Sequence, residues 1–365
     1  MTSYTLLTPG PTPLPDEVYR EIAKPILHHR TTEFRASMKR VFEDLKYVFQ
    51  TQECEPFILS SSGTGALEAA VINFFNPGEK VLIAAIGSFG ERWASIAQNF
   101  GIDAQVIKEE WGNAADPDKV EDILKKNPDI KGIFVTHVET STGTLNNIKA
   151  FGNLAVKYGA LLLIDAVSSL AGEEFCQDLW HVDVCVSGSQ KGLMCPPGLA
   201  LISVSKKALN KMKTVTTPRF YWDLNRYVKA KTTDETPFTP PVQLIAALSV
   251  SLNMIKKETL PARYARIKEL SEFTRNEVTD RFKAEFFSKS PANILTAFKL
   301  PKSLAGNAIT STQILKTIRE NRKISIADGQ GPQKGKLFRI AHIGAITKED
   351  VKKGLDALSE HLSHA

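Results

Sequence analysis

Lys191 is the residue of this sequence best placed for covalent chemistry. It stands between two largely apolar segments, residues 182–189 and 198–205, in a stretch of small residues that ends in Pro-Pro-Gly at 196–198. Most lysines are solvated on the surface, but so much apolar sequence on both sides argues against that reading here. A lysine that is partly removed from water has a lowered pKa, so its amine becomes a usable nucleophile.

Asp165 is the second candidate, because it directly follows the apolar run at 159–164. An acid at the end of an apolar strand is poorly solvated and needs a partner. That partner is either a cationic nitrogen on a bound cofactor or a neighbouring arginine or backbone N–H group.

Ser62, Gly63, Thr64 and Gly65 form the third candidate, at the turn between a predicted strand and a predicted helix. Small residues let backbone N–H groups approach an anion, and the positive end of the helix dipole favours negative charge there. The same residues would also serve as a glycine-rich turn with a Ser or Thr cap.

These three features together indicate one cofactor. They are a phosphate cup, an acid for a pyridinium nitrogen and an amine for an aldehyde, in that order along the chain. The cofactor that needs all three is pyridoxal 5′-phosphate.

The elements that must position these residues alternate between strand and helix. Short runs rich in Val, Ile and Leu, separated by helical patterns, predict an α/β fold with a mostly parallel sheet covered on both faces. In such a sheet ligands bind beyond the carboxyl ends of the strands, where the candidates lie. The polar segment 137–143 follows another predicted strand and would either line the pocket or form a polar loop.

The length of 365 residues predicts more than one domain. We expect an extended, proline-rich N-terminal arm at 1–16, a large domain at 17–250 and a smaller α+β domain at 251–365. Within the large domain, the pattern from Asp16 to Phe49 predicts helix.

Composition narrows the class of protein. The net charge of +6 is spread along the chain with no basic arm, so nucleic-acid binding is not implied. No apolar run is long enough to span a membrane, and the first residues do not resemble a secretory signal. Four cysteines without CxxC spacing predict reduced thiols in a cytoplasmic protein, and no residues predict a metal site.

The sequence resembles the class V, fold-type I aminotransferases that use pyridoxal phosphate, and most closely the alanine/serine–glyoxylate group. The resemblance runs from residue 8 to 344 through eight segments: TPGPTPLP, SSSGTGALEAA, GSFGER, HVETSTG, LLLIDAVSSLAG, SGSQKGLMCPPGLA, TPFTPPV and GKLFRIAHIG. It implies a seven-stranded sheet in the large domain.

The resemblance also implies roles for particular residues. Lys191 would form the internal aldimine, and Asp165 would pair with the pyridinium nitrogen. Phe89 would stack on the ring, with Ser141 at its edge and Val167 at its other face. The phosphate would be held by Ser62, Gly63, Thr64 and Gln190.

Three further residues would complete the site. Arg339 would bind the substrate carboxylate through its guanidinium fork, unless a structural carboxylate occupies it. Gly10 would lie near the substrate. Thr239 would reach the phosphate of a neighbouring subunit, so the resemblance implies a homodimer that shares its active sites. Thr236 stands where parts of the family have a tyrosine that also touches this phosphate.

The reaction implied is a ping-pong transamination of a small amino acid, alanine or serine, with a 2-oxo acid such as glyoxylate or pyruvate. Lys191 would be both covalent anchor and general base. Aspartate, phosphoserine or aminoethylphosphonate transamination remains an alternative, as does a non-catalytic or hydrogenase-associated subunit. A cysteine desulfurase is disfavoured, because no cysteine follows Cys195 to act as its nucleophile.

Overall fold

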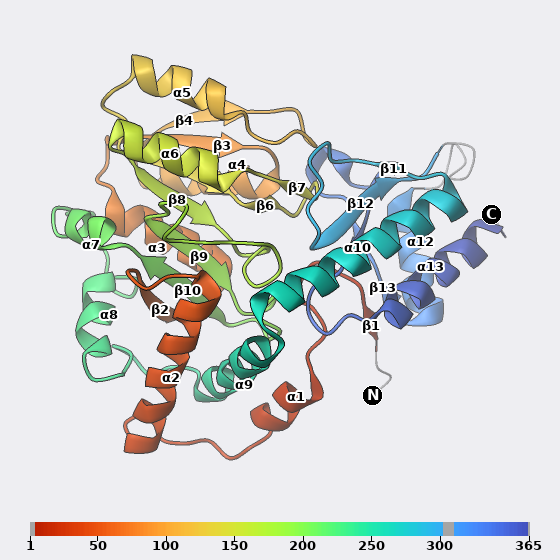
Figure 1. Ribbon diagram of the computed structural model, residues 1–365, viewed down its shortest axis with the longest axis horizontal. Helices are drawn as coiled ribbons and strands as arrows, with labels where there is room; N and C mark the ends of the chain where they lie inside the picture. Colours follow the sequence, from red (N-terminus) through yellow and green to blue (C-terminus); the bar gives the residue numbers. More distant parts are fainter. Residues whose placement is uncertain (1–3, 302–309, 364–365) are drawn as a thin grey trace.

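A seven-stranded sheet forms the centre of the computed structural model, which describes residues 4–301 and 310–363 (Figure 1). Its strands, in spatial order, are β2 (Glu55–Ser60), β10 (Leu199–Val204), β9 (Val184–Gly188), β8 (Leu161–Asp165), β5 (Gly132–Thr136), β3 (Lys80–Ala85) and β4 (Asp103–Lys108). β10 runs antiparallel to both of its neighbours, and the remaining pairs are parallel. The predicted α/β class with a mostly parallel sheet is confirmed.

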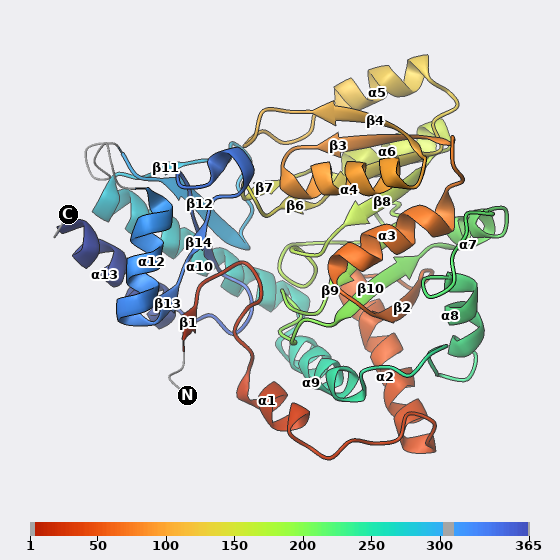
Figure 2. The same cartoon turned by 180° about the vertical axis from the view of Figure 1, so that it is seen from behind.

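Helices cover both faces of this sheet, because successive strand residues point to opposite sides. In β5, Ile133 and Val135 belong to one apolar cluster and Phe134 to the other. The first cluster packs under α2 (Thr32–Phe49), α5 (Pro117–Lys126), α6 (Ile148–Tyr158) and α9 (Val242–Glu258). The second packs under α3 (Gly63–Phe74), α4 (Ser88–Asn99), α7 (Lys206–Met212) and α8 (Leu224–Lys231), which face the viewer in Figure 2.

The helical pattern predicted from Asp16 to Phe49 is interrupted in the structure. A short helix, α1 (Asp16–Ile22), ends before α2 begins at Thr32. Pro25 lies in the loop between them, and a proline both lacks an N–H group and disfavours helical geometry in the residue before it. The predicted helical pattern is therefore confirmed for Asp16–Ile22 and Thr32–Phe49 and wrong for the loop between them.

A second, antiparallel sheet lies towards the C-terminal end of the chain (Figure 1). Its strands are β11 (Glu285–Phe286), β12 (Leu295–Lys299), β15 (Phe338–Ala341) and β14 (Ala327–Asp328), and α10 (Leu260–Phe282), α12 (Ser311–Arg322) and α13 (Lys348–Ser363) accompany it. The N-terminal arm joins this part of the molecule, because β1 (Thr5–Leu6) pairs in parallel with β13 (Ile324–Ser325). Shorter elements are β6 (Val138–Glu139), β7 (Thr144–Leu145) and a 3-10 helix at Gly331–Gln333.

Helix α10 connects the two apolar cores. Leu260, at its start, packs in the core of the large sheet, whereas Leu270 and Val278 pack with the second sheet. Residue 250 stays a predicted domain boundary, and it falls within α9, just before this connecting helix.

Arg263 fastens α10 to the large domain. Its side chain is 1% exposed, and it donates to the backbone oxygens of Ala171 (2.7 Å) and Gly192 (2.6 Å). Its third contact is an ion pair with Glu258 at 2.8 Å. Gly192 follows Lys191, so this buried arginine holds the loop that carries the candidate nucleophile.

Replacing Arg263 by alanine is expected to lower the free energy of unfolding by about 3 kcal/mol, because two buried carbonyls lose their donor and Glu258 loses a buried partner. Urea unfolding measures this change. Arg266→Ala is the matched control, since Arg266 also pairs with Glu258 but is 42% exposed, and it should cost less than about 1 kcal/mol. Equal losses in the two variants would contradict this account.

Candidate active site

The candidate residues follow the carboxyl ends of five parallel strands. They are Ser62, Gly63 and Thr64 after β2, Phe89 after β3, Ser141 after β5, Asp165 and Val167 at the end of β8, and Gln190 and Lys191 after β9. Parallel strands end at one edge of the sheet, so the topology gathers these residues there.

Lys191 is partly buried beneath the N-terminal arm. Thr12 pins the arm in place, donating from its hydroxyl to the Lys191 carbonyl at 3.1 Å and from its N–H group to the Gln190 carbonyl at 3.1 Å. Gly10 then lies directly against the lysine, since a Cβ there would overlap Lys191 Cδ, Cε and Nζ. Desolvation, with a further contribution from the Arg339 charge, lowers the pKa of Lys191 to about 8.

Asp165 is buried at the end of β8, and burial raises its pKa to about 6. The N–H group of Val167 donates to its carboxylate at 2.9 Å, and the charge of Lys191 also favours its ionised form. His137 donates its backbone N–H to the Asp165 carbonyl, and burial lowers the pKa of its ring to about 3. The backbone of His137 thus adjoins the strand end that carries the Asp165 carboxylate.

The turn at the start of α3 has the features of a phosphate cup. α3 begins at Gly63, and the hydroxyl of its N-cap residue Ser62 does not cap the helix. Gly63 packs so closely on Val167 that a Cβ would lie 2.7 Å from Val167 Cγ2. The Arg92 guanidinium reaches this turn, donating to the Thr64 hydroxyl at 3.3 Å and lying 4.8 Å from the centre of the Phe89 ring.

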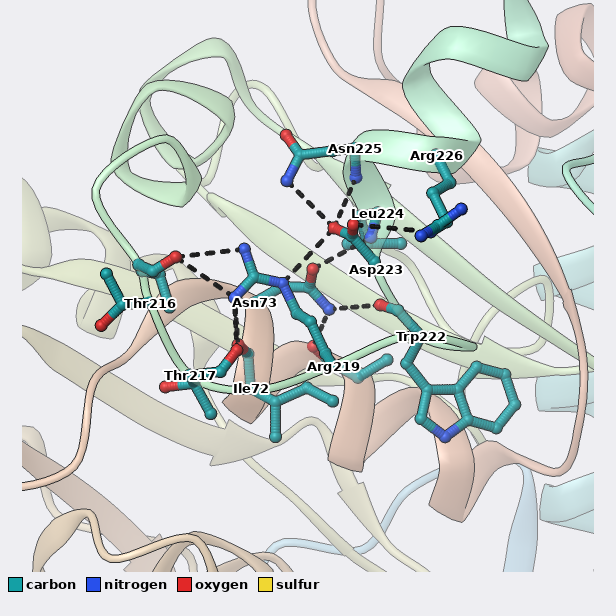
Figure 3. A network of polar contacts seen from close by, with 12 residues as sticks. Ile72, Asn73, Thr216, Thr217, Arg219, Trp222, Asp223, Leu224, Asn225 and Arg226 are labelled. Carbon is teal, nitrogen blue, oxygen red and sulfur yellow. Dashed lines mark hydrogen bonds and ion pairs between the residues drawn. The ribbon is translucent and has the colours of Figure 1, made fainter.

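A polar network holds the segment after α7 against the C-terminal end of α3 (Figure 3). Asn73 of α3 donates to the carbonyl of Trp222 at 2.6 Å and accepts from the N–H of Leu224 at 3.0 Å. Arg219 donates to the carbonyl of Thr217 at 2.9 Å and lies 3.4 Å from the Asp223 carboxylate. The network places Trp222 so that a Cβ on Gly65 would lie 3.4 Å from its ring.

Ser141 is fully buried, and its hydroxyl is already engaged. It donates to Glu139 at 2.5 Å and accepts from the N–H group of Ser88 at 3.1 Å. Its neighbour Thr140 instead contacts the Ser168 hydroxyl, and its carbonyl accepts from Arg339. Thr140 is thus hydrogen-bonded to Arg339, another candidate residue of the site.

Arg339 lies on β15 of the second sheet and is 5% exposed. Its guanidinium donates to the carbonyl of Asp328 from Nε (2.8 Å) and Nη2 (2.5 Å), and to that of Thr140 from Nη1 (2.8 Å). No carboxylate forms an ion pair with it within residues 4–301 and 310–363, and burial lowers its pKa to about 10. One N–H group on each terminal nitrogen thus stays available for a carboxylate.

Thr239 and Thr236 lie on the loop before α9. Thr239 is exposed, whereas the Thr236 hydroxyl donates to the Phe238 carbonyl at 2.7 Å. The contact of Thr239 with a neighbouring subunit stays a prediction. Gln190 is partly buried, and its Oε1 has no hydrogen-bond partner among the described residues.

Arg92, Thr140 and Glu139 take part in this arrangement although the sequence did not single them out. Glu139 and Thr140 lie inside the polar segment 137–143, and Arg92 lies in the GSFGER segment. The signal that could have found Glu139 is the position of this polar segment after the apolar run at 132–135. Together the residues form a site with the amine of Lys191, the carboxyl group of Asp165 and an arginine, Arg339, that has free N–H groups.

Lys191→Met is expected to stabilise the protein without added cofactor, because the folded state disfavours the charged amine. Between pH 8 and 10.5 the unfolded lysine is protonated and the folded one is not, so wild-type stability rises with pH across this window. The variant should exceed the wild type by about 3 kcal/mol at pH 7, and the difference should vanish near pH 10.5. Urea unfolding at several pH values gives both quantities.

The control for this experiment is Lys316→Met on α12, where the side chain is 66% exposed. It should change stability by no more than about 0.5 kcal/mol, with no trend across the pH window. A Lys191→Met variant no more stable than the wild type at pH 7 would show that the amine is not destabilised by burial.

Comparison with known proteins supports this chemistry. The family model "Aminotransferase class-V" matches residues 6–352. The serine–glyoxylate aminotransferase of Methylorubrum extorquens is 37% identical, and the match covers 94% of this chain and 87% of that protein. The soluble hydrogenase 42 kDa subunit of Anabaena cylindrica is 39% identical, with 95% and 90% covered.

A solved structure shares the whole fold. The crystal structure of alanine–glyoxylate aminotransferase from Nostoc sp. superposes with a TM-score of 0.94 at 28% identity, covering 99% of this chain and 96% of that one. The family match spans nearly all of this chain and includes every candidate residue. The chain belongs to the class V aminotransferases, a family of pyridoxal-phosphate-dependent enzymes.

Proposed function

We propose that this enzyme transfers the amino group of alanine or serine to a 2-oxo acid such as glyoxylate or pyruvate, by a ping-pong route. The observation that carries this proposal is the placement of Lys191 within electrostatic reach of both Asp165 and Arg339. An amine, an acid and a carboxylate receptor are the three groups that amino-acid chemistry on pyridoxal phosphate requires.

The residues present fit that cofactor. The orphan N–H groups at the start of α3 and the hydroxyls of Ser62 and Thr64 suit a phosphate, and Gly63 keeps the turn free of a side chain. Gln190 can contact a phosphate only through its amide NH2 group, because its Oε1, which has no hydrogen-bond partner among the described residues, is an acceptor. Phe89 and Val167 would flank the ring, and Asp165 would face its nitrogen.

The cofactor, when bound, supplies an aldehyde that condenses with amines and a protonated ring that withdraws electrons from the substrate Cα. Lys191 Nζ would hold the aldehyde and, once released by the incoming amine, carry the proton from Cα. Its lowered pKa of about 8 leaves part of the amine unprotonated near neutral pH. Asp165 would keep a proton on the ring nitrogen.

Arg339 would orient the substrate. Its free N–H groups, one on each terminal nitrogen, suit both oxygens of an α-carboxylate, and its bonds to the carbonyls of Asp328 and Thr140 fix the plane of the fork. Gly10, packed against Lys191, would leave room for the substrate next to the amine.

The choice of alanine or serine rests on relatives named for serine–glyoxylate and alanine–glyoxylate transamination. Aspartate, phosphoserine and aminoethylphosphonate are alternative donors. A hydrogenase-associated or non-catalytic role, suggested by the name of the Anabaena cylindrica relative, is disfavoured because Lys191 and Asp165 are both retained.

We also propose a cytoplasmic homodimer. Thr239 is exposed on the isolated chain, so it is free to contact a neighbouring subunit. The four cysteines form no disulfide, which suits a reducing compartment: Cys54, Cys176, Cys185 and Cys195. No helix in residues 4–301 and 310–363 has the length and apolarity to cross a membrane.

Absorbance and a donor panel test the proposed function. Purified protein with pyridoxal phosphate should show a yellow band that Lys191→Ala abolishes. Alanine and serine should then turn over with glyoxylate or pyruvate, measured against aspartate and 2-oxoglutarate. Absence of the band would reject the cofactor assignment, whereas turnover of aspartate alone would reject only the substrate assignment.

Arg339→Lys is expected to raise KM for the amino acid by about 10- to 100-fold, because a lysine cannot make the paired contact with a carboxylate. The yellow band should persist, since Arg339 is not proposed to hold the cofactor. Steady-state kinetics and the absorbance spectrum measure the two effects. An unchanged KM would remove Arg339 from substrate binding, and Arg322→Lys on the exposed face of α12 serves as the control.

A further inference from the structure

Glu139 is a fully buried carboxylate at the centre of the site that the proposed chemistry does not use. Its Oε2 accepts from the N–H groups of Phe89 (3.1 Å) and Gly90 (3.2 Å), and its Oε1 accepts from the N–H and hydroxyl of Ser141 (3.1 and 2.5 Å). The side chain therefore ties the first turn of α4, which carries Phe89, to the loop after β5.

Glycine at position 87 makes this contact possible. A Cβ on Gly87 would lie 2.6 Å from both Cγ and Cδ of Glu139. The carboxylate thus packs directly on the backbone of the turn. No larger residue at position 87 would allow the same approach.

The hydrogen bonds favour the ionised form of Glu139. All four partners donate: three are backbone N–H groups, and the Ser141 hydroxyl accepts from Ser88, so its own proton points to the carboxylate. Two of the donors also belong to the first turn of α4, where the helix dipole favours negative charge. These contacts oppose the desolvation that raises the pKa of Glu139.

Glu139 is one of four charged groups that act on Lys191. The carboxylates of Asp165 and Glu139 favour the protonated form of Lys191, and the guanidinium groups of Arg339 and Arg92 disfavour it. Glu139 also raises the pKa of Asp165 and of Arg339. A single buried anion therefore acts on three residues of the proposed mechanism.

We propose that Glu139 is a positioning residue of the reaction: its buried carboxylate holds the first turn of α4, which carries Phe89, against the loop that carries Ser141, and so orients both towards the cofactor. This inference rests on the proposed function, because its readouts require bound pyridoxal phosphate. It assigns no covalent or proton-accepting role to Glu139 itself.

Glu173 offers a matched control within the same chain. It is also a buried glutamate (6% exposed) that accepts from backbone N–H groups, those of Asn293 and Ile294, and its pKa is likewise raised by burial. It does not contribute to the shift of Lys191. Glu173→Gln therefore reproduces the structural cost of neutralising a buried glutamate without the effect on the site.

The test compares wild type, Glu139→Gln and Glu173→Gln, each loaded with pyridoxal phosphate. In Glu139→Gln, the pKa that governs the yellow band should fall by about half a unit, because a nearby negative charge is lost. The visible circular dichroism of the bound cofactor should weaken, and kcat should drop by about 10-fold or more with a smaller change in KM. Glu173→Gln should lower the melting temperature but leave the band, its pKa and its circular dichroism as in the wild type.

Equal spectroscopic behaviour of the two glutamine variants would overturn the proposal, because Glu139 would then be structural only. If Glu139→Gln does not fold, Glu139→Asp carries the test, because it keeps the charge but shortens the side chain that reaches the N–H groups of Phe89 and Gly90. It should weaken the visible circular dichroism with little change in the pKa of the band, and an unaltered spectrum would overturn the proposal. Absence of any band in the wild type would instead reject the proposed function.

Discussion

Burial of charge without a full set of partners is the constraint on which this structure depends. Lys191, Asp165 and Arg339 are each largely removed from water. Burial lowers the pKa of Lys191 and Arg339 and raises that of Asp165, so in each case it favours the neutral form. Such groups persist only where backbone donors and acceptors fix them. The fold supplies these at the carboxyl ends of the parallel strands, where strand carbonyls and helix-start N–H groups meet.

The N-terminal arm and the second sheet complete the site that the large sheet begins. The arm brings Gly10 against Lys191 through Thr12, and its strand β1 pairs with β13, so it belongs structurally to the C-terminal part. Arg339 reaches the site from β15 and binds the carbonyl of Thr140. Helix α10 joins the two cores, and its Arg263 is bound to Gly192, the residue after Lys191.

The sequence was enough to predict which residues carry the chemistry, but not which contacts those residues make. Lys191 and Asp165 could be found because a charged residue beside an apolar strand is rare and lies where parallel strands end. The alternation of strand and helix likewise predicted the sheet. The orientation of Ser141 and the reach of Arg92 could not be predicted, because both depend on how the turns after different strands pack together. The break at Pro25 was missed because helical periodicity on both sides concealed it.

The hydrogen bonding of Arg339 has a consequence for the protein in the cell. Its guanidinium, which among the described residues is bonded only to carbonyls, would gain a carboxylate under the proposed function when substrate binds, and the turn at the start of α3 would gain a phosphate when cofactor binds. Ligands that bind only the folded state stabilise it by mass action, by about 2.7 kcal/mol at a concentration one hundred times Kd. The lifetime of this enzyme against proteolysis would therefore follow the supply of its cofactor, so that scarcity of the vitamin reduces the amount of protein as well as its occupancy.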